Sequence, residues 1–234
     1  MTILEAIQNR HSIRRYKDTP LSEDVVSALQ QKINEVNAEG NLNIQLVTDE
    51  PKGFNSILNY GTFSGVRNYF VVAGKKAEDL DERVGYYGEQ LVLLAQQLGL
   101  NTCWAGLTYL KVAGTYSLND GEKIVCYIAV GYGAEEGRNM KRKSVQELSN
   151  ASDLTPKWFA QGVEAAQVAP TAVNQQKFFF EYLGCKGNDK PIVRATKKFS
   201  LMGYTKLDLG IAKLHFEIGA GKENFVWGEC HFLN

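Results

Sequence analysis

The 234-residue chain carries no net charge, because 26 Lys and Arg residues balance 26 Asp and Glu residues. Proteins that coat nucleic acid or anionic membranes usually carry a basic excess, so this balance argues against both partners. Charged residues make up 22% of the chain and hydrophobic residues 44%, which is ordinary globular usage and excludes a disordered chain. A folded chain of this length buries roughly 70–75% of its surface, enough for a core of its own.

Cysteine is scarce, and its pattern excludes one class of site. The four cysteines form no Cys-x-x-Cys pair and have no histidine at ligand spacing, so we predict no metal site. Cys126 lies in an apolar run and is typical of a core thiol. The wide spacing favours a reducing compartment, with a disulfide as the alternative. The cysteines are Cys103, Cys126, Cys185 and Cys230.

Long apolar runs and familiar catalytic motifs are also missing. No run approaches the roughly 20 residues that cross a bilayer. Residues 1–12 lack the pattern of a signal peptide, so we expect a cytoplasmic protein. There is no P-loop and no G-x-S-x-G, and Gly131-Tyr132-Gly133 lacks the third glycine of a dinucleotide fingerprint. His11, His215 and His231 stand apart from any nucleophile, and we expect His215 to be structural.

Apolar spacing predicts helices and strands along the whole chain. Ser22 is expected to cap a helix that Gly40 stops. Thr155 is expected to cap another, with Pro156 at its first position and Leu154 packed on the following turn as a hydrophobic staple. We expect helices over 3–10, 22–40, 88–99, 155–169 and 210–221, and strands over 44–46, 69–73, 124–130 and 178–183.

The second half of the chain repeats the order of the first. Each half has a capped helix, a strand, a helix bounded by glycines and then a tryptophan, Trp104 or Trp227. This order predicts an internal duplication. A composition break at 149–153 is the expected linker, so we place the halves at residues 1–150 and 151–234.

Two basic clusters lie in this chain without net charge. The first, Arg10-His11-Ser12-Ile13-Arg14-Arg15, follows the N-terminal helix. Guanidinium forks and a hydroxyl can surround a phosphate, and the alternative is a solvated loop whose arginines lie over the surface. The second cluster, residues 138–143, either contributes cations to the same anion or forms an exposed linker.

Residues 169–178 form a third candidate segment, in which a proline ends a helix and a turn rich in Asn and Gln enters an aromatic strand. Asn and Gln side chains offer a donor and an acceptor together, which suits the amide-like edge of a planar heterocycle. The alternative is ordinary turn chemistry, in which these side chains cap exposed backbone. The residues alone leave both interpretations open.

Four segments together resemble motifs of the FMN-dependent nitroreductase family over nearly the whole chain. Residues 10–16 (RHSIRRY) resemble its R-[RH]-S-x-R/K flavin-phosphate motif, and residues 169–176 (APTAVNQQ) its A-P-S-x-x-N-x-Q motif. Residues 98–106 (LGLNTCWAG) resemble its L-G-L-x-S/T-C-W-x-G segment, and residues 130–133 (VGYG) its l-G-Y-P turn. The resemblance implies an α+β fold with mixed, largely antiparallel sheets flanked by helices.

The order of these motifs departs from that of ordinary members, which carry the P-S-x-x-N motif early in the chain. Residues 41–45 hold that place here and match poorly, and the motif lies in the second half with Thr171 in place of serine. Ordinary members are homodimers with flavin at the interface. The resemblance therefore implies a monomer built as a pseudodimer, with one flavin per chain, and leaves further association open.

The activity that the resemblance implies is ping-pong hydride transfer from NADH or NADPH, through FMN, to a nitro compound or quinone. The chemistry would take place on the flavin N5, so the resemblance implies no catalytic side chain. Two rival hypotheses are a flavin-binding carrier or regulatory module without turnover, and a flavin-free interaction protein that keeps the fold. The implied cofactor-binding residues are Arg10, His11, Ser12, Arg14, Gly106, Lys141, Arg142, Pro170, Thr171, Ala172 and Asn174.

Overall fold

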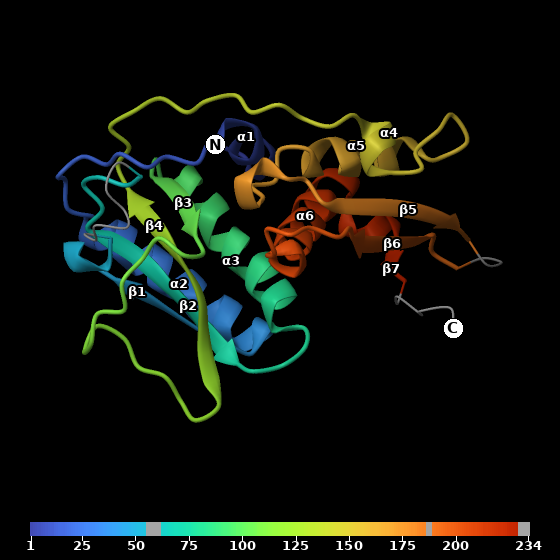
Figure 1. Ribbon diagram of the computed structural model, residues 1–234. Helices are drawn as coiled ribbons and strands as arrows, with labels where there is room; N and C mark the ends of the chain where they lie inside the picture. Colours follow the sequence, from blue (N-terminus) through green and yellow to red (C-terminus); the bar gives the residue numbers. More distant parts are fainter. Residues whose placement is uncertain (55–61, 186–188, 229–234) are drawn as a thin grey trace. The chain divides into compact units, whose positions relative to one another are not determined.

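The computed structural model describes residues 1–54, 62–185 and 189–228 (Figure 1). Cys230 and His231, both considered above, lie outside the described residues. The chain forms two compact units, Met1–Asn139 (unit 1) and Met140–Asn234 (unit 2). In the described ranges no helix is long and apolar enough to span a bilayer.

Unit 1 is built on a four-stranded antiparallel sheet in the order β1-β2-β4-β3. Its helices α2 and α3 pack on each other, and both contact strands of this sheet (Figure 1). The central strands β2 and β4 are apolar and largely buried. The elements are α1 (Ile3–Asn9), α2 (Glu23–Gly40), β1 (Leu42–Val47), η1 (Pro51–Gly53), β2 (Asn68–Lys75), α3 (Leu80–Gln97), β3 (Asn101–Ala105) and β4 (Glu122–Gly131).

Unit 2 combines a three-stranded sheet, β5-β6-β7, with a helix pair. Strands β5 and β6 are antiparallel, and β6 and β7 are parallel. Helices α5 and α6 pack closely because Gly162 and Gly219 face the opposite helix, where a Cβ atom would overlap Ala220 or Ala165. The elements are α4 (Val145–Leu148), α5 (Lys157–Ala166), η3 (Ala172–Asn174), β5 (Phe178–Gly184), β6 (Ile192–Lys197), α6 (Thr205–Ala220), η4 (Lys222–Asn224) and β7 (Val226–Trp227).

The expected extent of α2, residues 22–40, agrees with the helix Glu23–Gly40, but the residue that ends it is not the expected one. Ser22 caps the helix by accepting a hydrogen bond from the Val25 N–H at 3.4 Å. Gly40 is still helical, and Asn41 takes the left-handed conformation that ends the helix, at φ 47°. Gly40 serves packing instead, because a Cβ atom there would overlap the ring of Tyr87.

Two glycine-bounded helices begin earlier than expected, α3 at Leu80 and α6 at Thr205. Gly88 lies inside α3 and does not begin it. This position is a glycine because the Trp104 ring occupies the space that a side chain would need.

The cap predicted for α5 is also wrong. Thr155 donates its hydroxyl to the Ser152 carbonyl at 2.8 Å, and Pro156 takes the cap position. Leu154 is 95% exposed and is no staple.

The α+β class, with largely antiparallel sheets flanked by helices, is confirmed. The chain divides into its two units between Asn139 and Met140, whereas composition placed the linker at 149–153. The reason is α4, which packs on α5 and β5 and so belongs to unit 2. Strand β6 has no counterpart among the expected strands, since its sequence IVRATK has only two strongly apolar residues.

Candidate functional site

The first basic cluster runs as extended chain along unit 1 after α1. Its backbone is held by three different segments: Ile13 N–H donates to the Thr102 carbonyl (3.1 Å), Tyr16 N–H to Ser64 (2.9 Å) and Lys17 N–H to Tyr132 (2.8 Å). Ile13 and Tyr16 enter the core cluster on one face of the sheet, whereas Arg14 and Arg15 stay exposed. The cluster is therefore a fixed strand-like segment and not a loose loop.

Arg10 differs from the other cations of this segment because its side chain is only 9% exposed. Its Nε lies 3.8 Å from Oε1 of Glu89, a fully buried carboxylate on α3. Burial lowers the pKa of Arg10, and the Glu89 carboxylate opposes that shift. Arginine stays protonated under such shifts, so Arg10 is a positioned positive charge at the end of α1.

His11 and Ser12 lie between β3 and the segment that follows β4. Ser12 forms a parallel bridge with Thr102 of β3. Gly137 lies directly against the His11 ring, where no Cβ atom would fit. Gly137, near the end of unit 1, therefore lies beside the first basic cluster.

Glu135 fixes the exposed part of the same segment. Its Oε1 accepts hydrogen bonds from the backbone N–H groups of Arg14 (3.0 Å) and Arg15 (3.2 Å), and its Oε2 lies 3.6 Å from Arg15 Nε. The Arg14 N–H is the largest cause of the lowered pKa of Glu135. Glu135 binds Arg14 through its backbone N–H, and the Arg14 side chain is exposed.

Gly106, the remaining predicted residue of unit 1, follows β3 directly and is half-buried.

In unit 2 the predicted residues surround an unusual turn, centred on η3. Val173, Asn174 and Gln176 have left-handed backbone angles, with φ of 46°, 56° and 44°. Such angles are strained in residues other than glycine, most of all in β-branched ones, and strain of this kind often marks functional sites. Val173 is also 73% exposed, so packing of its side chain does not explain its conformation.

A buried carboxylate on α6 holds this turn. Asp208 is 1% exposed, and its two oxygens accept hydrogen bonds from the Ala172 N–H (2.9 Å) and from Nε2 of Gln175 (2.7 Å). Burial raises the pKa of Asp208 to about 6, and the two hydrogen bonds oppose this rise. The carboxylate thus binds the backbone and a side chain of the turn together.

The other side of the turn holds the second basic cluster. The Lys141 carbonyl accepts hydrogen bonds from Nδ2 of Asn174 (2.8 Å) and Nε2 of Gln176 (2.9 Å). Lys143 N–H donates to Oε1 of Gln176 at 2.9 Å. The segments 140–143 and 169–178, predicted separately, therefore lie side by side. The Asn174 amide binds backbone here, as the turn-chemistry alternative proposed.

The cations of the second cluster divide into two kinds. Lys143 Nζ donates to the carbonyls of Gln175 (3.0 Å) and Gln176 (2.6 Å), and burial is the main cause of its lowered pKa. The side chains of Lys141 and Arg142 are exposed. Lys143 therefore supports the turn, and Lys141 and Arg142 are the cations available to an anion.

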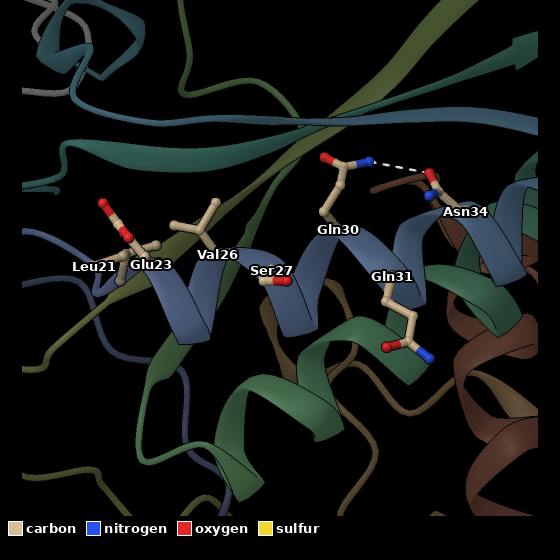
Figure 2. A pocket seen from close by; sticks show the side chains of 7 residues that line it. All are labelled: Leu21, Glu23, Val26, Ser27, Gln30, Gln31 and Asn34. Carbon is tan, nitrogen blue, oxygen red and sulfur yellow. Dashed lines mark hydrogen bonds between the residues drawn. The ribbon is translucent and has the colours of Figure 1, made fainter.

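Two surface hollows are lined by none of the predicted site residues. One, of about 580 Å³, follows the outer face of α2 and is lined by Leu21, Glu23, Val26, Ser27, Gln30, Gln31 and Asn34 (Figure 2). The other, of about 700 Å³, lies beside Pro51, Phe54, Phe63 and Arg67. Among the described residues no group of three or more His, Cys, Asp or Glu side chains is placed to hold a metal ion.

Sequence reasoning missed three residues that shape these segments: Glu89, Glu135 and Asp208. Two of them carried a usable signal. Glu89 precedes the apolar run LVLLA of α3, and Asp208 stands between Leu207 and Leu209 of α6. A lone carboxylate in an apolar stretch of helix is almost never buried without a partner.

The fold is that of the nitroreductases. A putative nitroreductase from Thermotoga maritima superposes with a TM-score of 0.66 at 22% identity, over 95% of this chain and 85% of that one. A putative nitroreductase from Desulfovibrio desulfuricans, solved in complex with FMN, gives a TM-score of 0.52 at 19% identity, over 67% of this chain and 99% of that one.

A nitroreductase-like protein from Streptococcus mutans gives a TM-score of 0.51 at 13% identity, over 64% of this chain and 97% of that one. Comparison with curated protein sequences finds no match. The family model described as "Putative TM nitroreductase" matches residues 2–220, and the chain belongs to this family.

Proposed function

We propose that the protein is an FMN-dependent oxidoreductase that passes hydride from NADH or NADPH to a nitro compound or a quinone. The observation that carries the proposal is the fixed basic segment of unit 1. Arg10 lies against the buried carboxylate of Glu89. Glu135 holds the backbone of Arg14, whose side chain is exposed. Family membership and the FMN complex of the Desulfovibrio protein support FMN as the cofactor.

The donor set of unit 1 fits a flavin phosphate. Arg10 offers a positioned guanidinium, Ser12 a hydroxyl, and His11 a ring packed against Gly137. Charge-assisted hydrogen bonds from such groups match the geometry of phosphate oxygens. The exposed Arg14 is assigned to the pyrimidine edge of the flavin, where a cation stabilises the negative charge of the reduced ring. Gly106 lets backbone approach the ring because it has no side chain.

We assign the predicted residues of unit 2 to the same cofactor. Lys141 and Arg142 are exposed cations on a segment whose backbone the strained turn holds in place. They are assigned to the phosphate. Pro170, Thr171, Ala172 and Asn174 are assigned to the border of the ring, with Asn174 acting through its support of Lys141. One flavin per chain is the stoichiometry that we propose.

FMN held by these residues would supply the redox chemistry, namely hydride transfer. The tasks of the protein are to bind the phosphate, to orient the ring and to stabilise negative charge beside it. No protein acid or base is needed for these tasks. The cytoplasmic location and the use of NADH or NADPH as electron donor stay predictions.

The purified protein tests this proposal directly. We expect a yellow protein whose flavin bands show one FMN per chain. We expect NADH or NADPH to bleach these bands under argon, and a quinone or nitro compound to restore them. A colourless protein that does not bind added FMN contradicts the proposal and supports the flavin-free interaction protein. A yellow protein that no nicotinamide bleaches supports the carrier or regulatory module.

A further inference from the structure

The turn at residues 172–176 is held in a strained shape from two sides. Three of its five residues are left-handed, and the two adjacent ones, Val173 and Asn174, do not have the freedom of glycine. A strained conformation persists only where its surroundings over-determine it. One anchor is the 141–143 segment, through Lys141 and Lys143. The other anchor is Asp208 on α6.

Asp208 is placed to act as a rigid anchor. It lies in the first turn of α6, a helix that packs on α5, β5 and β6, so the carboxylate cannot follow a moving turn. Negative charge is favoured in the first turn of a helix. Gln175 extends the anchor, because its Nε2 also donates to the Gly203 carbonyl in the loop before α6, at 3.0 Å.

Three cations of the neighbouring elements are engaged elsewhere. Lys143 Nζ binds the carbonyls of the turn, Lys198 Nζ binds the Glu147 carbonyl at 3.1 Å, and Arg194 Nε binds Glu181 at 2.9 Å. Neighbouring charge does not contribute to the pKa of Asp208, which burial and two hydrogen bonds determine. Burial of a carboxylate without a counter-ion is costly. The role of Asp208 in keeping the turn in its shape offsets this cost.

We propose that Asp208 is a positioning residue of the flavin site, which fixes the 172–176 turn and through it the Lys141 backbone. This inference rests on the proposed function. Asp208 acts on the cofactor only through the residues that it holds: Ala172 directly, and Asn174 and Lys141 through the shape of the turn. Loss of Asp208 should release the turn without unfolding unit 2.

The test measures two properties of the same variants. Amide hydrogen exchange of the peptide 170–178 is followed in flavin-free protein, and the FMN dissociation constant is measured by fluorescence titration. In Asp208→Ala we expect amide exchange to accelerate and the FMN dissociation constant to rise, each by about tenfold or more. An effect of this size is expected when hydrogen bonds to a charged group are lost.

Asp208→Asn should restore part of the wild-type behaviour. Its Oδ1 can accept from the Ala172 N–H. Its amide can donate to Oε1 of Gln175, a buried oxygen without a hydrogen-bond partner here, once the Gln175 amide turns over, but the turned amide no longer donates to the Gly203 carbonyl. Glu217→Gln is the matched control. Glu217 is a buried acid on the same helix that accepts from the Trp227 indole at 2.6 Å, away from the turn, so exchange at 170–178 should not change.

Unchanged exchange at 170–178 in Asp208→Ala overturns the inference, as does equal acceleration in Glu217→Gln. If Asp208→Ala does not fold, Gln175→Ala removes one of the two hydrogen bonds and is expected to accelerate exchange to a smaller extent. Wild-type protein that binds no FMN overturns the proposed function and the flavin part of the inference. The exchange measurement then still decides whether Asp208 holds the turn.

Discussion

The indole N–H of Trp104 donates a hydrogen bond to the buried carboxylate of Glu89 at 2.9 Å. The other oxygen of Glu89 faces the guanidinium of Arg10. Unit 2 repeats this arrangement: Trp227 donates to Glu217 at 2.6 Å, and Lys222 Nζ lies 3.5 Å from the other carboxylate oxygen. Each unit therefore joins a tryptophan, a buried acid of its long helix and a cation.

We predict that Trp104→Phe lowers the free energy of unfolding by about 1–3 kcal/mol, because a buried carboxylate oxygen loses its indole donor. Trp227→Phe should have an effect in the same range. Urea unfolding followed by circular dichroism measures both. Trp158→Phe is the control, since Trp158 is half-buried and stacks on Phe225. Equal losses in all three variants would mean that ring size, and not the hydrogen bond, matters.

Arg10→Gln is predicted to weaken FMN binding by about tenfold or more, since a charge-assisted phosphate contact becomes a neutral one. Glutamine keeps a donor for Glu89, so the fold should survive. A reversal to glutamate is less informative, because it places two acids together in a buried position. Fluorescence titration with FMN gives the affinity.

The control for this variant is Arg15→Gln. Arg15 belongs to the same segment, but its side chain is 72% exposed and lies beside Glu135. Its loss should leave FMN affinity within about twofold of wild type, as is usual for an exposed ion pair. Full retention of FMN by Arg10→Gln would remove Arg10 from the phosphate site.

Val173→Gly should stabilise the flavin-free protein by about 1 kcal/mol, because glycine adopts the left-handed angle without the strain of a β-branched residue. The side chain lost is exposed, so little packing is lost with it. The melting temperature should rise. A clear decrease would show that the Val173 side chain makes contacts that outweigh its backbone strain.

Asp208 is predicted to make stability depend on pH. Its pKa is raised from 3.8 to about 6 in the folded protein, so the folded state binds the proton more tightly than the unfolded state. Its contribution to stability is therefore fully present below pH 4 and is lost as the pH rises through 6. Relative to Asp208→Asn, wild-type protein should lose on the order of 2 kcal/mol between pH 4 and pH 7. Urea unfolding across this range measures the difference, and a constant difference would contradict the assignment.

Local patterns in the sequence determined much of the fold. The Ser22 cap, the apolar spacing of α2 and the strands β2, β4 and β5 depend on neighbours in the chain, and all were predicted. The left-handed residue at the end of α2 was assigned to Gly40, and it is Asn41. Asparagine and glycine both adopt that conformation, so only the position of Tyr87 decides between them.

The candidate site shows the same division. The sequence by itself determined which residue types are present, namely two basic clusters and an Asn- and Gln-rich turn, and which family they resemble. Only the tertiary structure decided that Glu89 supports Arg10 and that Asp208 holds Ala172. Ala172 and Asp208 are 36 residues apart, and no periodicity connects them. Propensity and capping act over a few residues, whereas the partner of a buried charge is chosen by the packing of whole helices and strands.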